Sequence, residues 1–389
     1  MNLHTSNKLR RSEFDWLRVL AFGMLIFFHT GMLFVSWDWH IKNNELSAGI
    51  VWPMIFIGEW RMSLIFLISG VGVFYSLGYR SIKSFTKDRL KRILIPLIAG
   101  IFLLVAPQVY FERLTQGSDM DYLEFYLSFL RFEPYPSGNF SWHHLWFLLY
   151  LLVYCLILTP ILFAMKNSRL DIGNLNRWLI LLLPIFWLGT GEWVLAPQFP
   201  KTHSLYDDWL SHFMYVSIFL IGFLIAASQK AQGKIKSLRI RALIMAIAIT
   251  VVLYTFFWVG TLGSEYNNKK VYYYLVAANR WLWILTILGF SLQYLNKPSG
   301  HLPTVNQYVY PFYILHQTVI IILGYYFQDV DVSIFLKFTV ISLSTFVICY
   351  FVVRFLIMKF DILRILFGMK PLKIIEVKNK KQFKTLYHD

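Results

Sequence analysis

The sequence predicts an all-α polytopic membrane protein with about ten transmembrane helices, and three observations support this fold class. Of its 389 residues, 57% are hydrophobic and only 15% are charged, whereas soluble domains carry about 25% charged residues. The mean hydropathy is +0.53. The stretches 19–37, 93–111, 145–165 and 242–264 contain no Asp, Glu, Lys or Arg. An apolar run of about 18 or more residues is typical of a helix that crosses a bilayer.

The ten expected helices are the apolar runs that lie between charged connections. They cover residues 16–36, 50–78, 93–111, 145–165, 178–196, 209–228, 242–262, 274–293, 308–327 and 334–354. The first has a basic start, but Asp15 and Arg18 interrupt its apolar part and no small-residue cleavage site follows. We therefore expect it to be retained, unlike a signal peptide. Residues 1–358 form one ten-helix domain, and 359–389 form a basic cytoplasmic tail.

The distribution of charge predicts the orientation of these helices. The connections between the expected helices are numbered in chain order, and the odd-numbered ones are 36–50, 112–144, 197–208, 263–273 and 328–333. Most of the 37 lysines and arginines fall in the termini and the even-numbered connections. Acidic residues gather in the odd-numbered connections, chiefly 112–144. Lys and Arg are enriched in cytoplasmic loops, so both termini are expected in the cytoplasm, with the protein multi-pass in the cell inner membrane. The net charge of +16 then reflects topology and contact with membrane lipid, and we expect no nucleic acid partner.

Two smaller features complete the expected organisation. Residues 121–130, which mix acidic and aromatic side chains, are expected to form a short interfacial helix within the long external connection. The only cysteines, Cys155 and Cys349, both lie inside expected helices. They offer neither a disulfide framework nor a metal-ligand spacing, and we expect no bound metal.

Arg18 and His29 are the most informative polar residues inside the expected membrane segments. Ionisable groups at this depth are costly and are functional candidates by default. The two residues are eleven positions apart, which places them on one helix face about 16 Å apart. Asp15 lies three residues before Arg18 and can pair with it. The alternative is a snorkelling arginine and a structural histidine satisfied by a neighbouring helix.

Further candidates lie at the helix ends. Arg89 and Arg92 are spaced i, i+3 before Pro96, with Lys91 between them, and two guanidiniums on one face suit phosphate recognition; ordinary flanking charge is the alternative. His144 lies at the outer mouth of the fourth expected helix and His316 within the ninth. We assign no role to four other intramembrane charges, Glu59, Arg61, Glu192 and Arg280.

These segments, taken in order, resemble the acyltransferase-3 family of membrane acyltransferases. The matching positions are Asp15, Arg18 and His29 in the first helix, Phe66–Gly70, the arginines Arg89 and Arg92 before Pro96, and Tyr313–His316. The resemblance implies an integral-membrane O-acyltransferase that moves an acyl group, succinyl or acetyl, from cytoplasmic acyl-CoA to a hydroxyl of an extracytoplasmic glycan. Within the family it is greatest to the branch that succinylates periplasmic glucans.

The resemblance also implies roles for the candidate residues. His29 is expected to be the general base, which requires a neutral imidazole, and Arg18 to position the acyl-CoA donor. His144 and His316 are expected on the acceptor side or as orienting groups. Arg89, Arg92 and Lys91 would hold the CoA phosphates, and Ser69 is expected on the same donor side. The acyl group could pass directly or through an acyl-enzyme; Ser69 offers a hydroxyl for the latter, but the sequence gives no base beside it.

A transporter or flippase for a lipid-linked glycan is the alternative from another functional class. Paired intramembrane charges (Glu59/Arg61, Glu192 and Arg280) would suit that function equally well. The sequence shows no internal repeat of the kind that many transporters have, and phosphate-binding arginines are less needed there. The sequence therefore favours the acyltransferase.

Overall fold

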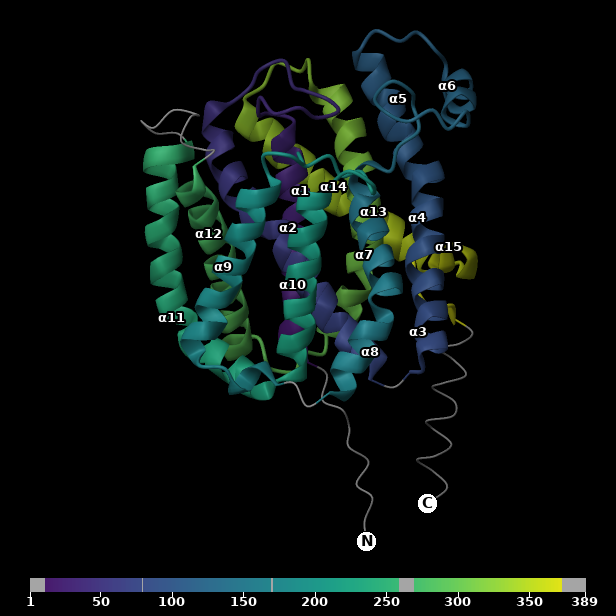
Figure 1. Ribbon diagram of the computed structural model, residues 1–389. Helices are drawn as coiled ribbons and strands as arrows, with labels where there is room; N and C mark the ends of the chain where they lie inside the picture. The colour runs from purple at the N-terminus through teal and green to yellow at the C-terminus, as the bar shows by residue number, and fades with distance from the viewer. Residues whose placement is uncertain (1–10, 79, 169–170, 259–268, 373–389) are drawn as a thin grey trace, which may run out of the picture.

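A computed structural model of the chain describes residues 11–78, 80–168, 171–258 and 269–372 (Figure 1). These residues form helices and connections, with a single isolated β-bridge between Pro134 and Phe140. The α-helices are α1 (Ser12–Met32), α2 (Ala48–Leu77), α3 (Ile82–Arg89), α4 (Ile95–Gly100), α5 (Ala106–Thr115), α6 (Tyr122–Phe129), α7 (Trp146–Ile157), α8 (Thr159–Asn167), α9 (Arg177–Leu195), α10 (Trp209–Ala227), α11 (Gln229–Val252), α12 (Lys270–Tyr294), α13 (Leu302–Phe327), α14 (Ile334–Phe351) and α15 (Asp361–Leu366).

Eight helical segments of the described chain are long and apolar enough to cross a membrane. A ninth is obtained if the bent pair His143–Ile157 and Thr159–Asn167, which meet at 58°, counts as one span. The predicted all-helical, polytopic fold is thus confirmed, whereas ten spans are not. The bend in the fourth expected helix has a local cause, because Pro160 lies at the start of α8 and a proline removes a helical hydrogen bond.

The first expected helix is the one that the apolar criterion leaves out. Helix α1 has 21 residues, about 32 Å at 1.5 Å per residue, so its length suffices. Its polar residues, Asp15, Arg18 and His29 among them, lower its hydropathy. Neighbouring helices α2, α12, α13 and α14 all contact it, and Figure 1 shows it within the bundle. A central helix can hold such polar groups because protein, rather than lipid, surrounds them.

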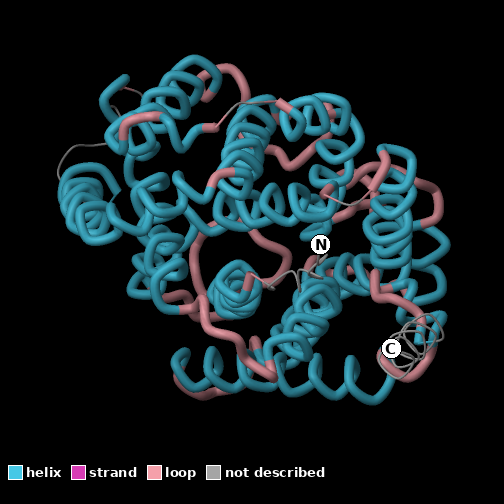
Figure 2. Tube along the Cα trace, turned by 90° about the horizontal axis from the view of Figure 1, so that it is seen from below, coloured by secondary structure: helices cyan, strands magenta, loops and turns pink. Residues whose placement is uncertain are grey.

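The long helices run side by side in Figure 1, and Figure 2 shows them from below as a cluster of coils. The described parts of the odd-numbered connections lie at one end of this bundle (Figure 1), and residues 263–268 are outside the described part of the chain. There Trp142 Nε1 donates to the carbonyl of His203 at 3.0 Å, and Lys337 Nζ donates to Asn43 Oδ1 at 2.8 Å. At the opposite end, Lys234 Nζ donates to the carbonyl of Gly173 at 2.6 Å. Connections 112–144 and 197–208 therefore meet at one end and 166–177 and 229–241 at the other, while the sidedness of the two ends stays a prediction.

The third expected helix is longer than its apolar run, and its winding changes from α-helical to π-helical in two places. It is continuous over Ile82–Thr115, but Leu90–Leu94 and Ile101–Val105 are π-helical. Such segments occur frequently at functional sites. The expected interfacial helix is present as α6, and Asp121 caps it by accepting from Glu124 N at 2.9 Å.

The described part of the expected tail packs on the bundle. Helix α15 contacts α4 and the π-helical segment Val352–Ile357. Arg364 is buried and donates to the carbonyls of Lys370 at 2.7 Å and Met358 at 3.2 Å. Residues 373–389, where most of the tail lysines lie, are outside the described residues.

The orientation of the bundle can be tested by cysteine labelling. Asp119 and Gln229 are exposed at opposite ends, and both native cysteines are buried, so they should react slowly. We expect an impermeant maleimide to label Asp119→Cys in intact cells and to label Gln229→Cys only after the membrane is opened. Equal labelling of both variants in intact cells would contradict the predicted topology.

Candidate functional site

A polar cavity of about 810 Å³ opens near the end of the bundle where α2 and α3 are connected. Its basic and hydroxyl-bearing lining residues are Arg18, Ser69, Tyr75, Ser76, Arg80, Arg89, Arg92, Tyr310, Arg364 and Lys370. We call it the arginine cavity. Arg18, Ser69 and the pair Arg89 and Arg92, which come from three separate parts of the sequence, thus line one cavity. A cavity lined by so many cations suits a ligand with several negative charges.

Asp88 is the counter-ion of three of these arginines. Its carboxylate contacts Arg80 at 3.0 Å, Arg89 at 2.7 Å and Arg92 at 3.0 Å. Ser76 Oγ accepts from Arg80 at 2.7 Å and from Arg89 at 3.1 Å. The π-helical winding of Leu90–Leu94 changes the i, i+3 helix geometry expected for Arg89 and Arg92, yet both still reach Asp88. One carboxylate among three guanidiniums leaves a net positive charge for a phosphate.

Arg18 is fixed at the edge of this cavity by the first turn of α1. Its Nη1 donates to Asp15 Oδ1 at 3.1 Å, which confirms the predicted pair. Asn306 on α13 completes the contact: its Oδ1 lies 3.4 Å from Arg18 Nη1, and its Nδ2 donates to Asp15 Oδ1 at 2.8 Å. These hydrogen bonds hold the Arg18 guanidinium at a defined position beside the cavity.

Lys91 and Ser69, the other two residues predicted on the donor side, are less suited to binding CoA phosphates than the arginines. Lys91 is exposed and is absent from the cavity lining. Ser69 lines the cavity, but its hydroxyl donates to the carbonyl of Ile65 in its own helix at 2.8 Å. Such a local bond is common for serine in a helix, and it leaves Ser69 able to accept rather than donate.

His29 and His316 form a directly bonded pair between α1 and α13. His29 Nδ1 lies 2.8 Å from His316 Nε2, and His316 Nδ1 lies 2.7 Å from the carbonyl of Tyr313. A carbonyl only accepts, so His316 Nδ1 bears the proton and, in the neutral ring, Nε2 accepts from His29 Nδ1–H. This arrangement leaves Nε2 of His29 as the atom that can take up a proton. The sequence predicted both residues but not their pairing.

His144 lies beside this pair without bonding to it. Its ring and that of His316 are 5.4 Å apart and nearly perpendicular. His144 Nε2 donates to the carbonyl of Ile314 at 3.2 Å, and Nδ1 lies 3.5 Å from Gln108 Nε2. His144 is buried at 6% exposure, so it serves the packing around the pair and the orientation of α13.

Aromatic side chains separate the arginine cavity from the histidines. Phe22 and Phe147 line the cavity, and both contact the Tyr313 ring edge-on, at 5.4 and 5.7 Å between centroids. Tyr313 in turn lies 5.9 Å from the His316 ring. The two polar regions are therefore adjacent along α1 and α13 but are divided by this aromatic layer.

Three of the four intramembrane charges without an assigned role form a network that the sequence did not reveal. Arg280 on α12 bonds to Glu192 on α9 and, at 3.0 Å, to Glu59 on α2. The Glu59/Arg61 pair considered for a transporter is not among the ion pairs of the described residues. Because both carboxylates bond to one buried arginine, the network joins α2, α9 and α12.

Arg61 is a buried cation close to the histidines. Its guanidinium lies over the Phe28 ring, 3.3 Å from the centroid, and its Nε and Nη1 are buried without a hydrogen-bond partner. The Phe28 ring in turn lies 5.8 Å from the His29 ring between centroids. An unpartnered buried guanidinium is costly, so this position is a candidate for binding negative charge.

Several residues of the arginine cavity were not identified from the sequence. Arg80, Arg364 and Lys370 lie in connections or in the tail, where any basic residue fits the positive-inside pattern. Tyr310 lies three residues before Tyr313 of the Tyr313–His316 motif, but nothing in its own sequence context marks it. Only the fold shows that these side chains meet.

The comparisons with known proteins agree with this geometry. A family model described as an acyltransferase domain matches residues 11–354. Similar curated proteins are glucans biosynthesis protein C of Escherichia coli (strain SMS-3-5 / SECEC), 27% identical over 165 residues, and of E. coli O6:K15:H31 (strain 536 / UPEC), 28% identical over 166 residues. The same-named protein of Shigella dysenteriae serotype 1 (strain Sd197) is 27% identical over 165 residues.

Each of these alignments covers 42% of this chain and 40% of the relative, so the chain spans about two fifths of the curated relatives that it matches. No solved structure matches the chain. The family model, by contrast, extends over nearly the whole chain. It includes the paired histidines and the lining of the arginine cavity except Arg364 and residues 368–370. The chain therefore belongs to the acyltransferase-3 family.

Proposed function

We propose that this protein transfers an acyl group, succinyl or acetyl, from cytoplasmic acyl-CoA to a hydroxyl of an extracytoplasmic glycan across the cell inner membrane. The observation that supports it most is the placement of the arginine cavity and the His29–His316 pair along the same two helices. Family membership supports acyl transfer, and the partial likeness to glucans biosynthesis protein C supports a periplasmic glucan as acceptor.

On the donor side, Arg89 and Arg92 bind the CoA phosphates, with Arg80 as a third cation. Arg18, on α1 at the edge of the cavity, positions the donor, and the pantetheine arm of CoA extends from there toward the aromatic layer. The thioester then crosses between Phe22, Phe147 and Tyr313 to reach His29. Charge-assisted contacts of this kind supply both affinity and orientation.

The chemistry assigned to the histidines is general-base catalysis. His29 Nε2 removes the proton from the acceptor hydroxyl while that oxygen attacks the thioester carbonyl, and a tetrahedral oxyanion forms. Arg61 stabilises the oxyanion. When the intermediate collapses, the carbon–sulfur bond breaks and the CoA thiolate receives the proton from His29. His316 positions His29 by accepting its Nδ1–H.

Direct transfer fits the contacts better than an acyl-enzyme on Ser69. The Ser69 hydroxyl bonds to the Ile65 carbonyl, and the bonded histidines lie on the other side of the aromatic layer. A serine nucleophile needs an adjacent base, and none is bonded to Ser69 in the described part of the chain.

Donor binding tests the proposal. We expect acyl-CoA to raise the unfolding temperature of the detergent-solubilised protein, and Arg89→Ala or Arg92→Ala to weaken its affinity by about 10- to 150-fold, because a hydrogen bond to a charged group contributes roughly 1.5–3 kcal/mol. Lys83→Ala is the matched control, since Lys83 is an exposed cation on the same helix outside the cavity.

Unchanged affinity in both arginine variants would contradict the donor site. Mass spectrometry of cell-envelope glycans with and without the gene identifies the acyl group and the acceptor. Loss of a lipid-linked glycan from the outer leaflet, with glycan acylation intact, would instead support a flippase.

A further inference from the structure

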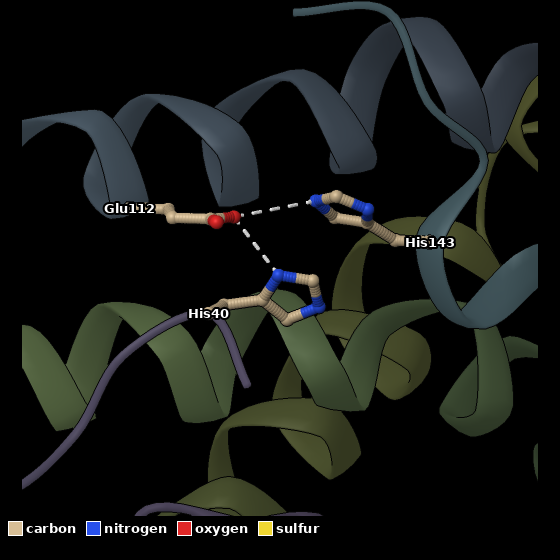
Figure 3. A group of neighbouring side chains, drawn as sticks. All are labelled: His40, Glu112 and His143. Atoms are coloured by element: carbon tan, nitrogen blue, oxygen red, sulfur yellow. Dashed lines mark hydrogen bonds and ion pairs between the residues drawn. The ribbon is translucent and has the colours of Figure 1, made fainter. Parts of the chain in front are cut away.

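Two histidines and a glutamate meet at the end of the bundle formed by the odd-numbered connections (Figure 3). They come from separate segments: His40 from the connection after α1, Glu112 from α5, and His143 from the turn before α7. His40 Nδ1 lies 2.9 Å and His143 Nε2 3.8 Å from Glu112 Oε2. All three atoms lie within 4.8 Å of one another, and Figure 3 shows both rings turned toward the carboxylate.

The ring nitrogen of His143 is the second observation that indicates a ligand. Its side chain is 3% exposed, and its Nε2 is buried with no hydrogen-bond partner. The other nitrogen, Nδ1, bonds to Ser141 Oγ at 2.8 Å, which fixes the ring with Nε2 facing Glu112. A buried polar atom without a partner is costly, and a ligand between the three side chains would remove that cost.

The carboxylate of Glu112 is held in a similar way. Its Oε1 accepts from the Tyr135 hydroxyl at 2.7 Å and lies 3.4 Å from Gln116 Nε2, so Oε2 is left for the histidines. Metal-bound carboxylates and histidines are commonly oriented by outer hydrogen bonds of this type.

We propose that His40, Glu112 and His143 bind a divalent zinc-class metal ion. Two imidazole nitrogens and one carboxylate are ligands that zinc takes, at about 2.0–2.2 Å each. Such bonds in a tetrahedron separate the ligand atoms by about 3.3 Å, between the two distances to Glu112 Oε2. His40 is the most exposed of the three at 14%, so water could reach a bound ion from this side.

The ion would join three segments that no disulfide holds together. It would also fix the residues beside His29, because Trp39 stacks on the His29 ring with 6.4 Å between centroids and 13° between planes. Lys42 anchors the same connection by donating to the carbonyls of Met32 at 2.8 Å and Val35 at 2.9 Å. The three proposed ligands are widely spaced along the chain, so the sequence alone predicted no metal.

Metal content and binding test the site without reference to catalysis. The full chain, purified with an affinity tag free of histidine and stripped with a chelator, should bind one equivalent of Zn²⁺ by calorimetry and should unfold at a higher temperature with it. Bound Co²⁺ should show the intense visible absorption of a four-coordinate site. Glu112→Gln and His143→Gln should weaken Zn²⁺ binding by at least about 10-fold.

His40→Gln removes the most exposed ligand, so it serves as the variant that is safest for folding, and it should weaken binding similarly. His301→Ala is the matched control, since His301 is exposed at the start of α13 and should bind Zn²⁺ as the wild type does. Wild-type protein that takes up no Zn²⁺ at micromolar concentrations, or folded cluster variants that bind it as tightly as the wild type, would overturn the proposal.

Discussion

His29→Gln and His29→Ala should each lower turnover by about 10²–10⁴-fold, which is the usual contribution of a general base. The amide of glutamine can keep a hydrogen bond to His316 but cannot take the proton from the acceptor hydroxyl. Acyl-CoA affinity should stay near the wild-type value, because the arginine cavity lies beyond the aromatic layer. Wild-type turnover should also fall on acidification, as the imidazole becomes protonated.

A purely structural His29 predicts a different pattern. Glutamine would then rescue activity, alanine would lower the unfolding temperature, and the acid side of the pH profile would not depend on this residue. His301→Gln controls for the loss of an exposed histidine. If folded His29→Gln protein retains more than about a tenth of wild-type turnover, His29 has no part in proton transfer.

The apolar runs predicted the helices better than they predicted their ends. The seventh expected helix begins at residue 242, but α11 begins at Gln229, capped by Ser228, whose Oγ accepts from Ala231 N at 3.0 Å. The added residues are polar, so hydropathy does not detect them. The opposite error occurs in α1, whose polar residues reduce the hydropathy signal although neighbouring helices accommodate them.

The sequence could predict single site residues but not their partners. His29 and His316 were detectable because a titratable group inside an apolar run is rare. Their pairing, and the resulting assignment of the proton-accepting atom, depends on contact between residues 287 positions apart. Arg80 could not be identified from the sequence at all, because basic residues are common in cytoplasmic connections. Only its contact with Asp88 in the fold marks it as part of the site.

Arg280→Met should destabilise the protein by about 3–5 kcal/mol, because it leaves a buried carboxylate without its counter-ion. Arg280 is 2% exposed and Glu192 4%, so water can compensate little. Glu59 is less affected, since its side chain is 22% exposed. The measurement is the free energy of unfolding in detergent by chemical denaturation, with Arg241→Met as control, since Arg241 is an exposed arginine on α11.

The double variant Arg280→Met/Glu192→Gln separates a structural role from transport. Replacing the stranded carboxylate with a neutral amide should restore part of the lost stability, since the main cost is an unpaired charge rather than the absence of the ion pair. Strictly additive losses would show that Arg280 and Glu192 do not act as a pair. A folded Arg280→Met protein with wild-type stability would mean that these charges do not join α2, α9 and α12, and would reopen a transport role for them.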